Sequence, residues 1–123
     1  MDENTVVVFA SDNGGATAAN VKELKLNGSL RGWKGDLYEG GIRVPMMVRW
    51  PNHIKPGTTS NQPCYFPDFL PTFCRMAGVK SLAVPTDGVD LSPALLGGKL
   101  PVRHLYWEQF PRQGLSQAVR YGR

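Results

Sequence analysis

The stretch TVVVFASDNGG, residues 5–15, decides the fold class. Its first part is apolar and rich in β-branched residues without alternation, which is typical of a strand buried on both faces in a parallel sheet covered by helices. A polar, glycine-rich string then ends the run abruptly at Ser11. We therefore expect a central strand over residues 5–10 and a tight turn directly after it.

The rest of the chain predicts alternating helices and strands. Residues 16–41 contain so many glycines that only a short helix fits there. Apolar residues at i, i+3 and i+4 spacing then indicate an amphipathic helix, with Asp68 as its N-cap and Gly78 just past its end. The order strand, helix, strand indicates an α/β fold. The expected elements are a short helix at residues 18–24, a strand at 42–50, helices at 65–77 and 91–96, and strands at 104–110 and 117–121.

The composition excludes several classes of protein. A chain of 123 residues suits one compact domain, and no apolar run approaches the roughly 20 residues that span a membrane. The net charge of +4 favours anionic partners, but the basic residues are scattered, so nucleic acid is not expected as a partner. The two cysteines, Cys64 and Cys74, cannot form a disulfide framework and are interpreted as buried thiols.

The turn after the first strand carries two oxygen donors. In open α/β sheets ligands gather at the carboxyl ends of strands, which is where Asp12 and Asn13 lie. A carboxylate and a neutral amide oxygen suit Ca²⁺ or Mg²⁺ rather than zinc. The alternative is an ordinary Asx-turn, since Asp-Asn-Gly is a common turn string.

The next glycine-rich block, LRGWKGDLYEGGIRVP at residues 30–45, is typical of a loop that folds closely around an anion. Lys34 can present a point charge to an oxyanion, and Glu39 and Arg43 can pair to hold the shape of the loop. Each also has an ordinary interpretation, as a solvated lysine and a surface ion pair. The physical pattern alone leaves both interpretations open.

The strings VVFASDNG, LRGWKG and YEGGIRVP, in this order and spacing, resemble the C-terminal half of the catalytic domain of formylglycine-dependent sulfatases, in the alkaline phosphatase superfamily. The resemblance runs from about residue 4 to residue 98. It implies part of an alkaline-phosphatase-like sandwich, with mostly parallel strands, flanking helices and a C-terminal strand pair. Residues 1–101 would then belong to the catalytic domain and residues 102–123 to the start of a C-terminal subdomain.

The resemblance also implies roles for individual residues. By position, Asp12 and Asn13 match two ligands of the family's divalent cation, usually Ca²⁺, with Mg²⁺ as the alternative. Lys34 matches the lysine that binds the sulfate group. Glu39 and Arg43 match residues that shape the loop. Related phosphatases tend to carry His where this chain has Asn13, so the asparagine favours sulfate over phosphate.

The catalytic nucleophile of the family is missing from this chain. The family makes formylglycine from Cys or Ser in a Cys/Ser-x-Pro-x-Arg motif, and neither Cys64 nor Cys74 begins one. The paired aspartates that complete the cation site and the acid–base histidines are also missing. We interpret His53 and His104 as structural or surface residues. The chain is therefore expected to be an inactive fragment of a sulfatase that hydrolyses aryl or sugar sulfates.

Two other functions and several properties of the parent stay open. The alternatives are a phosphate or phosphonate ester hydrolase of the same superfamily and a non-catalytic protein that binds sulfated glycans. A lone central strand predicts self-association through its exposed sheet.

The compartment is not predicted by these residues; family habit points to the periplasm, the extracellular space or the lysosome. The formylglycine is expected only in the missing N-terminal part.

Overall fold

The computed structural model describes residues 3–110 and 114–122. Within them the chain forms two compact units. Unit 1 comprises Met1–Trp50 and Tyr106–Val119, and unit 2 comprises Pro51–Leu105 and Arg120–Arg123. Helices and strands are both present, as an α/β chain requires. The predicted domain boundary after residue 101 stays a prediction.

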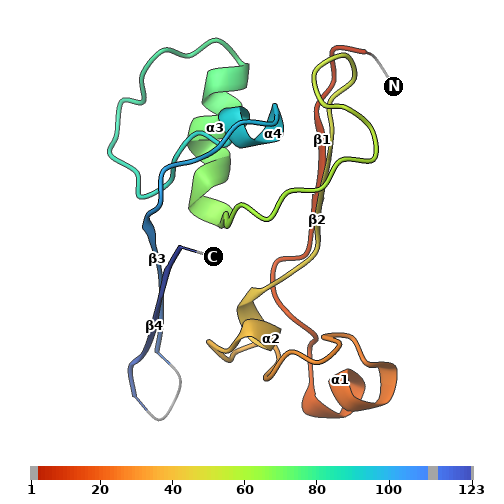
Figure 1. Cartoon of the computed structure of the whole chain (residues 1–123). Helices are drawn as coiled ribbons and strands as arrows, with labels where there is room; N and C mark the ends of the chain where they lie inside the picture. Colours follow the sequence, from red (N-terminus) through yellow and green to blue (C-terminus); the bar gives the residue numbers. More distant parts are fainter. Residues whose placement is uncertain (1–2, 111–113, 123) are drawn as a thin grey trace. The chain divides into compact units, whose positions relative to one another are not determined.

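The first sheet in unit 1 pairs β1 (Val7–Ala10) with β2 (Met46–Arg49), side by side in Figure 1. The two strands are antiparallel, so the expectation of parallel pairing is wrong for this pair. The reason lies in the connection, which leaves β1 and returns to the same end of the sheet. There the Ser11 N–H donates to the Pro45 carbonyl at 3.3 Å, one step beyond the last strand pair.

The β1–β2 sheet is exposed on one face. Phe9 and Met47 lie directly opposite each other in the register, and their exposed fractions are 60% and 62%. The prediction of a strand buried on both faces is therefore wrong for β1 in this chain. The physical reason is that a two-stranded sheet is too small to cover its own faces.

Two short helices follow β1 in unit 1. The expected short helix is confirmed as α1 (Ala18–Leu24). The sequence did not predict α2 (Glu39–Ile42), a single turn whose two glycines are buried. Because these glycines carry no side chains, other backbone segments can approach α2 closely.

The expected helix over residues 65–77 is present in unit 2 as two joined pieces. It begins as the 3₁₀ turn η1 (Phe66–Asp68), continues as α3 (Phe69–Met76) and is followed by Gly78 at φ 81°. Asp68 stands at the N-cap position of α3 but makes no side-chain cap bond there, so that predicted role is wrong. Its carboxylate instead accepts the N–H of Tyr65 at 3.0 Å and closes the start of η1.

The core of unit 2 is partly polar. Asp68 and Thr72, one helical turn apart, are buried together with Leu91 and Leu105. The Thr72 hydroxyl donates to the Asp68 carbonyl at 2.6 Å and accepts the Leu91 N–H at 2.8 Å. The bond from Leu91 to Thr72 ties α3 to the start of the next helix, α4 (Ser92–Leu95).

The predicted C-terminal strand pair is present. β3 (His104–Gln109) and β4 (Ser116–Tyr121) form the second two-stranded sheet. On it the Gln117 amide donates to Glu108 at 3.0 Å, and the Tyr106 hydroxyl also donates to this carboxylate, which lowers the pKa of Glu108. Among the described residues, no helix has the length and apolar character needed to cross a membrane.

Candidate functional site

The turn that follows β1 is organised by backbone contacts. The Ser11 hydroxyl donates to the Asn13 carbonyl at 2.8 Å, and the buried Gly14 N–H donates to the Gly41 carbonyl at 2.9 Å. Asp12 itself is exposed, and Asn13 is half-buried. The turn thus presents the Asp12 carboxylate outward, while its shape is fixed by neighbouring groups.

Buried glycines let three backbone segments meet behind this turn. A Cβ on Gly14 would lie 1.7 Å from the Gly40 carbonyl oxygen. A Cβ on Gly40 would lie 2.3 Å from the Gly32 oxygen, and one on Gly41 would lie 2.1 Å from the Asp36 oxygen. These distances leave no room for side chains, so the glycine-rich pattern reflects close backbone packing.

Asn27 connects the same segments through its side chain. Its Oδ1 accepts the Gly15 N–H at 2.9 Å, and its Nδ2 donates to the carbonyls of Gly32 and Gly40, both at 2.8 Å. Sequence reasoning missed this residue. Its signal was an asparagine within the glycine-rich stretch, but that pattern does not indicate which backbone groups the amide will meet.

The loop that carries Lys34 reaches the turn after β1. The Lys34 N–H donates to the Gly15 carbonyl at 2.8 Å. Within the loop, the Asp36 carboxylate accepts the Trp33 N–H at 3.1 Å, and the Gln109 amide of β3 donates to the Gly35 carbonyl. The structure therefore joins the backbone of Lys34 to the Asp12–Asn13 turn and leaves the lysine exposed.

The predicted pairing of Glu39 with Arg43 is present in the structure. The Arg43 guanidinium lies 3.4 Å from the Glu39 carboxylate, one helical turn away, and these side chains are 66% and 39% exposed, respectively. An exposed pair of this kind contributes about 0.3–0.5 kcal/mol at most. Nearby, the Arg31 guanidinium stacks 3.7 Å above the centre of the Tyr38 ring. The loop-shaping role of the pair stays a prediction.

The donors at the turn suit a hard cation in type but are too few in number. Asp12 supplies an exposed carboxylate, and Asn13 uses its amide nitrogen to donate to the Gly14 carbonyl at 3.2 Å, so its oxygen is the atom that can face a cation. Ca²⁺ takes six to eight oxygens. Over residues 3–110 and 114–122, no three His, Cys, Asp or Glu side chains converge as a metal site. Further ligands would have to come from elsewhere.

The cysteines and histidines do not form a nucleophilic centre in the described part of the chain. Within the described residues neither cysteine forms a disulfide, and both are half-buried. Burial, and secondly the nearby Asp68 carboxylate, raise the pKa of the Cys64 thiol, which disfavours the reactive thiolate. His53 is exposed, and His104 is exposed with its ring 4.6 Å from that of Tyr121.

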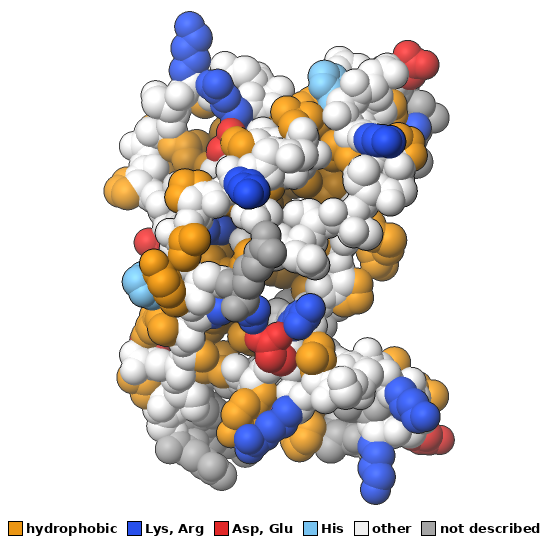
Figure 2. Space-filling model, in the orientation of Figure 1, with side chains coloured by type: hydrophobic (Ala, Val, Ile, Leu, Met, Phe, Trp, Pro, Cys, Tyr) orange, Lys and Arg blue, Asp and Glu red, His pale blue; other side chains and the backbone are white. Residues whose placement is uncertain are grey.

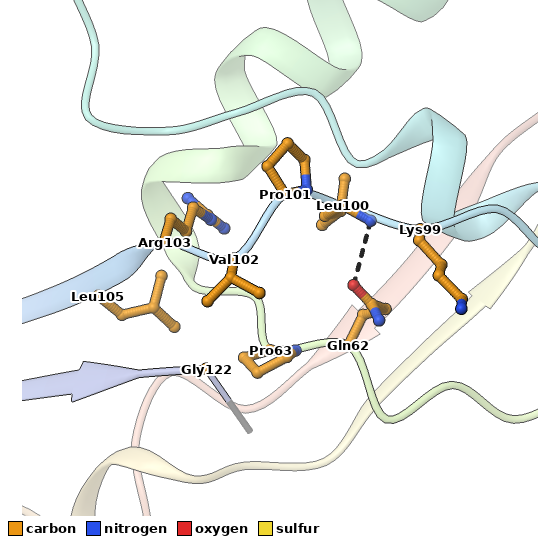
Figure 3. A pocket seen from close by; sticks show the side chains of 9 residues that line it. All are labelled: Gln62, Pro63, Lys99, Leu100, Pro101, Val102, Arg103, Leu105 and Gly122. Carbon is orange, nitrogen blue, oxygen red and sulfur yellow. Dashed lines mark hydrogen bonds between the residues drawn. The ribbon is translucent and has the colours of Figure 1, made fainter.

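Unit 2 contains a separate hollow of about 210 Å³, shown in Figure 3. Most of its wall is aliphatic, and the Gln62 side chain accepts the Leu100 N–H at 3.1 Å across it. Its arginine, Arg103, is paired with the buried Asp68 at 2.5 Å. Arg103 is thus neutralised, whereas Lys99, which also lines the hollow, is exposed. The hollow therefore pairs one exposed cation with an aliphatic wall, and it contains none of the residues that the resemblance assigns to the site.

Comparisons with known proteins identify the family of the chain. The family model described as "Sulfatase" matches residues 1–79. Arylsulfatase A of Homo sapiens is 43% identical over 106 residues, covering 85% of this chain and 20% of that protein. Steryl-sulfatase of Mus musculus is 38% identical over 130 residues, covering 98% and 20%. The chain therefore spans about a fifth of the length of these curated relatives.

A solved structure is similar over nearly the whole chain. It is the crystal structure of Ps i-CgsB in complex with k-i-k-neocarrahexaose. The match has a TM-score of 0.78 and 32% sequence identity, and covers 98% of this chain and 26% of that one. The arrangement of helices and strands described above is thus found inside a much larger fold.

Proposed function

Since this chain belongs to the sulfatase family, we propose that the protein containing it hydrolyses sulfate esters of aryl alcohols or sugars. The observation that carries the proposal is the 2.8 Å bond from the Lys34 N–H to the Gly15 carbonyl. It links the candidate sulfate-binding lysine to the turn that bears Asp12 and Asn13. The candidate cation ligands and the candidate sulfate-binding lysine therefore lie on two backbone segments that are hydrogen-bonded to each other.

Each residue has a distinct role in the proposed site. Asp12 and Asn13 supply a carboxylate and an amide oxygen to Ca²⁺, with Mg²⁺ as the alternative. A bound cation would add positive charge that attracts sulfate oxygens. Lys34 extends an ammonium group from the glycine-rich loop and binds the sulfate as a point charge. Glu39 and Arg43 hold the start and end of α2 and so support that loop.

The chain alone is proposed to be inactive. Ester hydrolysis needs a nucleophile and a proton source for the leaving alcohol. Cys64 lies outside any Cys/Ser-x-Pro-x-Arg motif, and its raised pKa keeps the thiol protonated at neutral pH. We place the formylglycine and the remaining cation ligands in parts of the protein outside these residues.

The test replaces Lys34 in the protein that contains this chain. Loss of a charge-assisted bond removes roughly 1.5–3 kcal/mol, so Lys34→Ala is expected to raise KM for an aryl sulfate about 10- to 150-fold. The matched control is Lys55→Ala, which removes an exposed lysine of unit 2 and is expected to leave KM unchanged. Chelation of Ca²⁺ is expected to reduce hydrolysis as well.

Other outcomes would favour the rival functions. Faster hydrolysis of the matching aryl phosphate would assign the site to phosphate or phosphonate esters. The net charge of +4 and the exposed Lys34 also fit a protein that binds sulfated glycans without cleaving them. Heparin binding that survives both Lys34→Ala and calcium removal, in a protein without hydrolysis, would contradict our proposal and favour that binder.

A further inference from the structure

Asn27 touches three separate backbone segments of unit 1, none of them its neighbours in the chain. It accepts from Gly15 beside the Asp12–Asn13 turn, and it donates to Gly32 in the lysine loop and to Gly40 in α2. We propose that Asn27 is a positioning residue that couples the cation-binding turn to the sulfate-binding loop. This inference deepens the proposed function and rests on it.

The chemistry of the amide explains why this position needs asparagine. A side-chain amide carries one acceptor oxygen and two N–H donors, and Asn27 uses the oxygen for an N–H and the nitrogen for two carbonyls. Aspartate has a similar shape but lacks both donors. It would turn a negative oxygen toward the carbonyls of Gly32 and Gly40. Alanine would remove all of these contacts.

The coupling runs through a continuous set of bonds. The Gly15 N–H donates to the Asn27 oxygen, and the Gly15 carbonyl accepts the Lys34 N–H, so one residue links the turn to the lysine loop. Gly14 and Gly40 approach too closely for any side chain to lie between them. A shift of the lysine loop is therefore transmitted to the turn, and the reverse holds as well. Each ligand is expected to order the same set of bonds, so sulfate should raise the affinity for Ca²⁺. By linkage, Ca²⁺ then raises the affinity for sulfate by the same factor.

Amide hydrogen exchange, followed by NMR on the 123-residue chain, tests the contact itself. We expect Asn27→Ala to speed exchange of the Gly15 amide about tenfold, as loss of one hydrogen bond of about 1.4 kcal/mol predicts. Asn27→Asp keeps the acceptor, so Gly15 is expected to stay protected. The control Asn61→Ala, at an exposed position of unit 2, is expected to leave the exchange rate of the Gly15 amide unchanged. An unchanged Gly15 rate in Asn27→Ala would overturn the proposal.

Binding measurements on the protein that contains this chain test the positioning role. The probes are Ca²⁺ and inorganic sulfate, each titrated with and without the other. Both Asn27 variants are expected to weaken each ligand and abolish their mutual enhancement, whereas a purely structural residue would lower the folded fraction and leave the dissociation constants of folded protein unchanged. That second result would overturn the proposal. If the wild type binds both ligands cooperatively but hydrolyses no sulfate ester, the proposed function fails while the assignment of Asn27 stands.

Discussion

At the scale of single residues, unit 1 depends on positions where a side chain would collide with backbone. The Gly14 Cβ position lies 1.7 Å from the Gly40 carbonyl oxygen, and backbone cannot move aside as a flexible side chain can. Gly28 offers a contrast, because its φ of +56° is left-handed but its Cβ position faces open space. The two glycines therefore separate the effect of collision from that of backbone conformation.

We expect Gly14→Ala to destabilise unit 1 by about 3 kcal/mol, the upper range for inserting atoms into a packed site. Gly28→Ala is expected to cost only the left-handed conformation, about 1–2 kcal/mol. Urea unfolding followed by NMR signals of unit 1 measures both. Equal losses in the two variants would mean that Gly14 and Gly40 are not packed as described.

The sequence indicated part of this site and left part of it hidden. Asp12, Asn13 and Lys34 stood out because their residue types and glycine-rich surroundings suit cations and anions, and the backbone bond at Gly15 does join their segments. Their roles stay predictions. Asn27 could not be found in the same way, because its partners lie at positions that only the folded backbone brings together.

At the scale of elements, α3 is held by buried polar groups. The Asp68 carboxylate is fully buried, accepts the Val89 N–H at 2.9 Å and forms two bonds with Arg103. The Arg103 guanidinium also lies 5.2 Å from the centre of the Tyr65 ring. One carboxylate thus joins the start of the helix, the loop before α4 and the residue before β3.

Removing the charge of Asp68 is expected to destabilise unit 2 strongly. In Asp68→Asn the half-buried Arg103 loses its counter-charge, and breaking an ion pair whose carboxylate is fully buried costs about 3–5 kcal/mol. The control Asp87→Asn changes an exposed aspartate and is expected to shift stability by less than about 0.5 kcal/mol. Denaturant unfolding of both variants provides the measurement. A loss below about 1 kcal/mol in Asp68→Asn would show that solvent reaches the pair.

The same helix shows what periodicity can and cannot predict. Apolar spacing located the helix to within a few residues, because helix formation depends on local pattern. It did not indicate which face is buried: Phe66, Leu70 and Phe73 are exposed, while Asp68 and Thr72 are buried. The buried face depends on an arginine 35 residues further along, which no local pattern contains.

At the scale of the whole molecule, the chain leaves much apolar surface uncovered. Figure 2 shows hydrophobic side chains at the surface, with Lys and Arg scattered among them rather than gathered in one patch. The β1–β2 sheet contributes the facing pair Phe9 and Met47. The chain amounts to 26% of the similar solved structure, so an apolar face of this kind agrees with a piece taken from a larger fold.

The exposed pair predicts that the isolated chain self-associates. Phe9 and Met47 together present an apolar face on a two-stranded sheet, which favours contact between copies. Light scattering of the wild-type chain is expected to show a mass that rises with concentration, and Phe9→Ser/Met47→Ser to shift it toward the monomer. The control Val84→Ser changes a loop residue that is 60% exposed and is expected to leave association unchanged. A wild-type chain that stays monomeric at high concentration would contradict the prediction, whereas equal effects of both variants would place the contact elsewhere.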